Sequence, residues 1–299
     1  MNELVELITS SIENPIGDPW FPDLTSQLTT SAWDRLRRET GLTRASYGTE
    51  RVLLRNPETS RDIISSLRLP EPDYPEIQIE GISEECASQY RQLGISFYSS
   101  QDTFDTDVIQ CLEEALLVLS RVPTLMRTIL ALVRSIHLIK PRSPDHDVSF
   151  SEPSVPFSVF VSVPQERYAT DVLRVAEAVV HEAMHLQLTL IEQHVPLANS
   201  TSNKYYSPWR NQYRNAQSIL HAIYVFTSVA KALVEIRSSG RWAVEWTDHI
   251  QSRCSEITKQ LLEVRAVQCI RELTPLGSSL VGWLMVTTGG LNVDDSRDY

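Results

Sequence analysis

The sequence predicts a mainly α-helical protein, a bundle-like single domain over residues 1–299 with a small β element. Glycine is scarce, at 10 residues, as expected of a chain built mostly of helices. Residues 165–194 contain neither glycine nor proline, and their apolar residues recur at helical spacing. In contrast, residues 158–163 (Ser-Val-Phe-Val-Ser-Val) alternate in character and are rich in β-branched and aromatic residues, which predicts a strand. The length alone also permits two smaller domains.

The first 140 residues are predicted to form short helices joined by proline-rich connections. These helices cover residues 3–12, 31–40, 46–54, 60–67 and 83–93. A long apolar segment, residues 107–139, is predicted to be helical and to be kinked or split by Pro123. The sequence assigns no role to residues 1–140.

Residues 147–164 are the one clear departure from helix, and the strand lies within them. The long helix over residues 165–194 follows directly and ends before Pro196. Two further helices are predicted over residues 215–237 and 243–273, and a frayed tail over residues 289–299.

Composition excludes several classes of protein. The net charge of −11 leaves no basic surplus to neutralise phosphates, so we expect no nucleic-acid partner. The cysteines form no C-x-x-C pair, which fits reduced thiols rather than a zinc ribbon or a disulfide framework: Cys86, Cys111, Cys254 and Cys269. The chain begins without signal-peptide features and has no apolar run long enough to cross a membrane. We therefore expect a cytoplasmic protein with no membrane partner.

An H-E-x-x-H motif, His181 to His185, lies within the long predicted helix. Histidines four residues apart share one helical face, with Cβ atoms about 5–6 Å apart. Both imidazoles can then reach one metal ion at about 2.0–2.1 Å. Glu182 is rotated by about 100° from His181, beside the ion rather than on it. The alternative is a pair of histidines that only form hydrogen bonds in the core.

The motif is typical of zinc peptidases, in which Glu182 would be the general base. The residues after it do not match the common peptidase patterns. Leu188 and Ile191 stand where the extended motif requires Gly and His. Glu192 lies two helical turns beyond His185, too far away to bind the same ion.

His221 is the main candidate for a third ligand, since it lies among apolar residues in the middle of the next predicted helix. A core histidine with a hydrogen-bond partner is the alternative. His137, His146 and His249 are weaker candidates, and His194 is expected to cap the end of the motif helix.

The loop between the two candidate metal helices contains Tyr206-Ser207-Pro208-Trp209-Arg210. An arginine after a rigid Pro-Trp pair is well placed to bind a carboxylate through two hydrogen bonds. A surface loop with an arginine in an ion pair is the alternative. Three protein ligands, open metal positions and a nearby arginine suit an iron oxygenase that chelates a 2-oxo acid.

Three strings together resemble a known family. They are H-E-A-M-H-L-Q-L at 181–188, Y-Y-S-P-W-R at 205–210 and L-H-x-x-Y-x-F at 220–226. The chain resembles, over about residues 145–285, the H-E-x-x-H-type peptide β-hydroxylases. These enzymes depend on iron(II) and 2-oxoglutarate, modify ribosomally synthesised peptides, and are mainly helical rather than cupin barrels. Residues 147–164 and the segment C-I-R-E-L-T-P-L-G-S-S-L at 269–280 also resemble family features.

The resemblance implies that His181, His185 and His221 bind Fe(II) and that Arg210 binds a carboxylate of 2-oxoglutarate. Tyr206, Trp209 and Tyr224 would line the pocket. The products would be succinate, CO2 and a hydroxyl on a side-chain Cβ of a precursor peptide, with O2 as oxidant. Glu182 would then orient a ligand or a water. Ala222 departs from the family's glycine but stays small.

Two other functions remain open from the sequence. One is a zinc metallopeptidase with Glu182 as its general base. The other is a non-catalytic helical protein that binds a precursor peptide or a partner enzyme.

Overall fold

A computed structural model describes most of the chain. The described residues are 3–40, 63–67, 69, 75–82, 84–99, 106–143, 147–151, 157–164, 167–200, 203–265 and 269–289. The predicted helix over 46–54, the tail beyond 289 and His146 lie outside them.

The chain divides into two compact units, whose positions relative to one another are not determined. Met1–Leu28 and Gln187–Tyr299 form one unit, which we call the helical unit. Thr29–Leu186 form the other, the sheet unit. Helices α2 (Pro22–Thr40) and α6 (Asp171–Glu192) each run through a boundary between the units.

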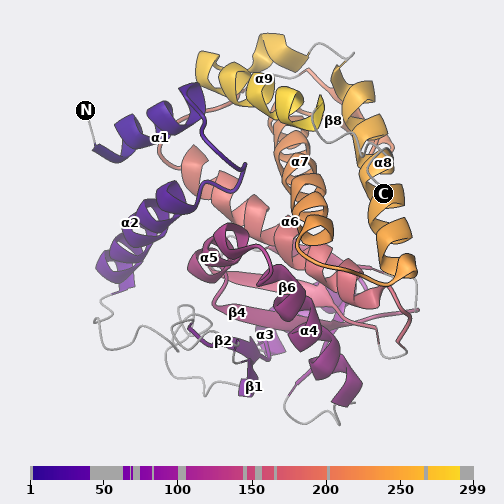
Figure 1. The fold of residues 1–299 in the computed structure, drawn as a ribbon. Coiled ribbons are helices and arrows are strands. Elements are labelled where there is room, and N and C mark those ends of the chain that lie inside the picture. Colours follow the sequence, from indigo (N-terminus) through magenta and orange to yellow (C-terminus); the bar gives the residue numbers. More distant parts are fainter. Residues whose placement is uncertain are drawn as a thin grey trace. The chain divides into compact units, whose positions relative to one another are not determined.

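The sheet unit is built around a mixed sheet (Figure 1). Its strand order is β1-β2-β4-β6-β5, and β3 pairs with β4. The strands are β1 Ile63–Leu67, β2 Ile77–Glu80, β3 Ser96–Phe97, β4 Ser135–Lys140, β5 Ser149–Ser151 and β6 Ser158–Ser162. Strands β2, β4 and β6 are parallel neighbours, whereas β1, β3 and β5 pair antiparallel with them. The helices of this unit, besides those shared at its boundaries, are α3 Glu84–Gln92, α4 Thr106–Leu119 and α5 Pro123–Leu132.

The two faces of this sheet differ in chemistry. Paired residues on neighbouring strands point to the same face, and successive residues alternate between faces. One face is apolar and carries Ile136, Leu138, Val159 and Val161, all fully buried. The other, which we call the polar face, carries Ser135 and His137 of β4 beside Ser158 and Phe160 of β6.

The strand predicted over 158–163 is confirmed as β6, but two segments predicted as helix are strands. Residues 107–139 form α4, α5 and then β4, with Pro123 opening α5 and Val133 in extended conformation at its end. The segment 60–67 contains β1. Strand β4 is a short apolar run buried on both faces, so its pattern does not distinguish a strand from a buried helix. The prediction that 147–164 is the one departure from helix is therefore wrong.

The helical unit contains α1, α7, α8 and α9 and the hairpin β7–β8. Their bounds are α1 Glu3–Glu13, β7 Tyr205–Ser207, β8 Gln212–Arg214, α7 Ala216–Ser238, α8 Val244–Arg265 and α9 Pro275–Gly289, with a 3-10 turn at Cys269–Glu272. Helix α7 packs against α8 and α9, and α1 packs against α9. The helix predicted over 243–273 thus ends earlier, at the end of α8. The mainly helical fold is confirmed, and the described strands close no barrel.

Helix α7 is the one described helix that is long and apolar enough to cross a membrane. Within its most apolar window, 67% is buried inside the protein. A core helix has the same length and composition, and the packing of α7 against α8 and α9 gives it that role.

Candidate metal centre

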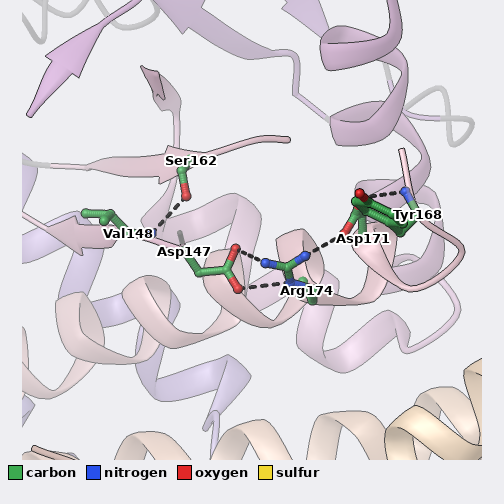
Figure 2. A network of polar contacts seen from close by, with 6 residues as sticks. All are labelled: Asp147, Val148, Ser162, Tyr168, Asp171 and Arg174. Carbon is green, nitrogen blue, oxygen red and sulfur yellow. Dashed lines mark hydrogen bonds and ion pairs between the residues drawn. The ribbon is translucent and has the colours of Figure 1, made fainter. Parts of the chain in front are cut away.

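The first turn of α6 is fixed by a network of charged side chains (Figure 2). The guanidinium of Arg174 donates to both carboxylate oxygens of Asp147, at 2.9 and 2.7 Å. It also donates to Oδ1 of Asp171, at 2.7 Å, while Oδ2 of Asp171 accepts from the backbone N–H of Tyr168 at 2.7 Å. The side chain of Asp171 is fully buried, so these bonds offset the loss of its hydration.

The same network holds strand β5 beside the helix. Asp147 immediately precedes β5, and the backbone N–H of Val148 donates to Oγ of Ser162, at 2.8 Å (Figure 2). Residues just before β5 are therefore tied both to β6 and to the start of α6. Ser149, two residues after Asp147, lies next to α6 and contacts Glu182 of the motif.

His181 and His185 lie together on α6, as the sequence predicts. Both are half-buried, and their ring centroids are 4.9 Å apart with an interplanar angle of 65°. Buried residues on the adjoining faces, among them Ala183 and Met184, hold the helix in the core. Two imidazoles on one face at this separation fit two donors to a divalent transition metal.

Glu182 is directed toward the sheet. Its side chain is buried, with a relative exposure of 3%, and its Oε1 accepts a hydrogen bond from Oγ of Ser149 at 2.7 Å. Ser149 is in register with Val161, so it belongs to the apolar face of the sheet. The sequence prediction missed Ser149, because a separation of 33 residues gives no local signal.

His137 lies on the opposite face of the sheet from this contact. It is in register with Phe160, one residue from Val161, and so it points away from Ser149 and Glu182. The sheet separates His137 from the motif, which rules it out as a ligand beside Glu182.

His221 lies on α7, half-buried, and pairs with a carboxylate. Its Nε2 is 2.8 Å from Oε2 of Glu192, and the same oxygen accepts from Nε2 of Gln217 at 2.9 Å. Glu192 is thus a partner of His221, a role that the sequence prediction did not give it. Histidines that bind metals commonly donate their second ring nitrogen to a carboxylate in this way.

Arg210 occupies the turn of the β7–β8 hairpin and is exposed. Its backbone N–H donates to the carbonyl of Ser207 at 3.3 Å, and Asn211 next to it has a positive φ of 49°. An asparagine tolerates this left-handed conformation, which closes the turn. The predicted loop is therefore an ordered hairpin that presents the guanidinium to solvent.

The three aromatic residues predicted to line the pocket differ in burial: Trp209 packs against α7, Tyr206 is exposed and Tyr224 is fully buried. The indole of Trp209 stacks on Phe226 of α7 with ring centroids 5.1 Å apart, and its Nε1 is buried without a hydrogen-bond partner among the described residues. Tyr206 is exposed and donates to Oδ1 of Asn211 at 2.8 Å. Tyr224 is fully buried, and its hydroxyl donates to the carbonyl of Pro19 at 2.7 Å. Tyr224 is thus a core residue.

The described residues contain no three His, Cys, Asp or Glu side chains arranged to hold one metal ion. His181 and His185 belong to the sheet unit, whereas His221 and Arg210 belong to the helical unit. Their assembly into one site stays a prediction. Of the other histidines, His194 lies in the turn that follows α6, where its capping role stays a prediction, and His249 is half-buried on α8.

Comparison with known proteins gives no family for this chain. No protein-family model matches the sequence, and no curated protein matches it significantly.

Proposed function

We propose that the chain is an iron(II)- and 2-oxoglutarate-dependent oxygenase that hydroxylates a side-chain Cβ in a ribosomally synthesised peptide. The observation that carries the proposal is the pair His181 and His185 on one face of α6, with Glu182 turned to Ser149. The resemblance of three sequence strings to peptide β-hydroxylases supports it.

The donor set fits Fe(II). Two neutral imidazoles suit this borderline metal, and a third protein ligand would leave positions for a chelating 2-oxo acid and O2. Bound iron would supply the activation of O2, one atom of which oxidises 2-oxoglutarate to succinate and CO2 while the other enters a C–H bond.

The environment of Glu182 supports this reading over a zinc peptidase. A general base must reach the water that it deprotonates, within about 2.6–3.2 Å or through one further water. Here one carboxylate oxygen of Glu182 is engaged by the neutral hydroxyl of Ser149, and the side chain is buried. In the proposal, the hydrogen bond of this carboxylate to Ser149 holds α6 in place and thereby orients His181 and His185.

His221 and Arg210 are part of the proposal as third ligand and cosubstrate anchor. With Nε2 of His221 held by Glu192, Nδ1 is the ring nitrogen that would bind the metal. The guanidinium of Arg210 and the buried Nε1–H of Trp209 lie in one hairpin turn. Two such donors suit a carboxylate of 2-oxoglutarate.

We place the reaction in the cytoplasm, with the precursor peptide as partner. The buried cysteines Cys111 and Cys254 are free thiols, which suits a reducing compartment.

The test is anaerobic reconstitution of the metal-free protein with Fe(II), followed by addition of 2-oxoglutarate. Chelation of iron by the 2-oxo acid is expected to give a visible metal-to-ligand charge-transfer band. His185→Ala should abolish the band, because it removes a ligand. His221→Ala should do the same if His221 completes the set, and Arg210→Ala should raise the 2-oxoglutarate concentration needed for half of the band.

His194→Ala is the matched control, since His194 lies just beyond the same helix and is not a proposed ligand. It should leave the band unchanged. A protein that forms no band and instead retains zinc contradicts the proposal and supports a peptidase. A protein that binds no metal at all supports the non-catalytic alternative.

A further inference from the structure

Strand β8 of the helical unit is an exposed edge strand. Its three residues, Gln212, Tyr213 and Arg214, are all exposed. Successive residues of a strand point to opposite faces, so both faces of β8 are open to solvent. Among the described strands β8 pairs with β7 alone, which leaves its outer edge with backbone N–H and C=O groups outside the ladder. An edge of this kind accepts an extended chain as a further strand.

The hairpin that carries this edge is fixed to α7 at its turn and at its end. Trp209, in the turn, stacks on Phe226 of α7 with an interplanar angle of 3°. Asn215, the residue after β8, caps α7 by accepting from the backbone N–H of Ser218. The edge of β8 is therefore ordered before a partner binds, which lowers the entropy cost of binding.

Two tyrosines lie side by side on one face of the hairpin. Tyr206 of β7 and Tyr213 of β8 are directly opposite in register, with ring centroids 5.9 Å apart. Tyr213 is 68% exposed. Tyrosine is enriched at protein interfaces because its ring offers a large, rigid contact area at low entropy cost. A side chain of an added strand would pack on Tyr213, the ring next to the outer edge.

The hairpin is also a basic segment of an acidic protein. Residues 193–234 contain no aspartate or glutamate, although the chain has 38 acidic residues and a net charge of −11. Within this run the hairpin region carries Lys204, Arg210 and Arg214, all exposed. In the parts of the chain that the structure describes, these three cations form no ion pair with an acidic side chain.

The carboxylates that contact the residues flanking the hairpin already have other donors. Oε2 of Glu192 accepts from Nε2 of Gln217 at 2.9 Å and lies 2.8 Å from Nε2 of His221. Oε1 of Glu272 accepts from the side chain of Asn203. The positive charge of the hairpin therefore complements a partner of negative charge.

We propose that β8 binds an acidic, extended peptide segment, which adds a strand to the β7–β8 sheet. The backbone groups of the edge would hold the main chain of the peptide, and Tyr213 would contact one of its side chains. Arg214 is in register with Tyr205, so Lys204 and Arg214 lie together at the open end of the hairpin, where they would pair with carboxylates. A nucleic acid has negative charge but no peptide groups to extend the sheet, and the net charge of the chain opposes it.

This inference rests on the proposed function only for the identity of the peptide. In an oxygenase that acts on a precursor peptide, the acidic segment would belong to that peptide and lie outside the residue that is hydroxylated. Arg210, at the hairpin turn, would remain the cosubstrate anchor. Peptide binding is measured without metal, 2-oxoglutarate or turnover, so its failure and the failure of the oxygenase are separate results.

The test uses the full, metal-free chain and a fluorescein-labelled peptide of alternating glutamate and valine. We expect saturable binding by fluorescence anisotropy, which weakens as the NaCl concentration is raised. A peptide of alternating lysine and valine should not bind. The double variant Lys204→Glu/Arg214→Glu should weaken binding of the acidic peptide at least about tenfold. Tyr213→Ala should weaken it at least about fivefold.

Two matched variants control for net charge and for loss of a tyrosine. Arg241→Glu/Lys259→Glu makes the same change in net charge at exposed positions of the helical unit outside the hairpin. Tyr168→Ala removes a tyrosine that is also exposed, in the sheet unit. Both should leave peptide binding within about twofold, because exposed charges and contacts far from the edge are screened or absent from the interface.

Main-chain pairing is tested with two N-methylated versions of the acidic peptide. Successive residues of a strand direct their N–H groups to opposite sides, so methylation of one alternate set blocks pairing and methylation of the other set does not. One version should lose binding and the other should keep it. Hydrogen exchange of the backbone at Gln212–Arg214 should slow when the unmodified peptide is bound.

The proposal is overturned if the acidic peptide shows no saturable binding up to about 1 mM. Equal binding to the hairpin double variant and to its charge control would also overturn it, as would equal binding of the two N-methylated peptides. Tighter binding of single-stranded DNA would assign the hairpin to a nucleic acid instead. A dimer in sedimentation that is lost in the hairpin double variant would assign the edge to a second copy of the chain.

Discussion

The hydrogen bond between Ser149 and Glu182 joins the sheet to the motif helix at a buried carboxylate. A carboxylate with 3% exposure has lost nearly all of its water, so each remaining donor contributes strongly to its stability. Glu182 lies between His181 and His185, and the bond fixes the rotation of α6 about its axis at the motif. The direction of both imidazoles depends on that rotation.

Ser149→Ala is expected to lower the free energy of unfolding by about 1–3 kcal/mol, because it removes a hydrogen-bond donor from a buried carboxylate. It should also weaken iron binding by about 10- to 100-fold, as the loss of a group that orients metal ligands does. Urea unfolding and iron titration measure the two effects. Ser151→Ala, on the same strand and face, is the control. Equal effects of the two substitutions would show that the bond is unimportant.

His137 makes stability depend on pH in the metal-free protein. Its pKa is lowered from 6.5 to about 4 by burial, so between these pH values the unfolded chain binds a proton that the folded chain does not. The free energy of unfolding should therefore fall as the pH is lowered from 6.5 toward 4, by up to about 1.4 kcal/mol per pH unit. Urea unfolding measured between pH 6.5 and 4 should show a smaller fall in the free energy of unfolding for His137→Phe than for the parent chain. Identical slopes would mean that another group causes the fall.

At the scale of elements, α6 owes its position to its first turn as well as to its apolar face. Arg174 bridges Asp171, within the helix, and Asp147, ahead of β5 (Figure 2). Arg174 thereby joins the start of α6 to the residue that lies two positions before Ser149, the first residue of β5. The bridge therefore holds the chain just ahead of Ser149 against the first turn of α6.

Arg174→Ala is expected to lower the free energy of unfolding by about 1.5–3 kcal/mol, because the fully buried Asp171 loses a charged donor. Arg91→Ala is the matched control, since it removes an ion pair with Glu84 in which both side chains are at least 50% exposed. Its effect should stay below about 1 kcal/mol. Thermal unfolding of both variants measures the difference, and an equally small effect for Arg174→Ala would contradict a structural role for the bridge.

The β7–β8 hairpin and α7 form a second set of elements with a functional role in the proposal. Asn215 caps α7, its side chain accepting from the backbone N–H of Ser218 at 2.8 Å. Trp209 joins the hairpin turn to α7 through Phe226. Arg210 is thus held on the same body as His221, which is the requirement for a cosubstrate anchor and a ligand to act together.

At the scale of the whole molecule, the two units contribute different parts of the proposed chemistry. The sheet unit provides His181, His185 and the residue that holds Glu182, and the helical unit provides His221 and Arg210. The metal that supports activity distinguishes the two functions without knowledge of the substrate: Fe(II) indicates an oxygenase, and zinc indicates a hydrolase.

Metal removal and replacement give the test at this scale. Dialysis against a chelator should abolish the conversion of 2-oxoglutarate to succinate, and Fe(II) should restore it whereas Zn²⁺ should not, since zinc has no redox chemistry. Succinate formation under air, with and without each metal, measures this. Peptide hydrolysis restored by Zn²⁺ would contradict the oxygenase and identify a peptidase.

The sequence by itself determined those features that depend on neighbours along the chain. The motif helix follows from a run free of glycine and proline, and the shared face of His181 and His185 follows from helical geometry alone. Strand β6 follows from its alternation, and the helix predicted over residues 215–237 is confirmed as α7.

Only the tertiary structure decided which residues meet across the sheet and between helices. The run Ser135–Lys140 became a strand because it is buried on both faces between β2 and β6, where its pattern alone is ambiguous. Ser149 reached Glu182, and Glu192 reached His221, across 33 and 29 residues. The register of the sheet placed His137 beside Glu80 and away from α6. Such contacts depend on long-range packing, which leaves no periodic trace in the sequence.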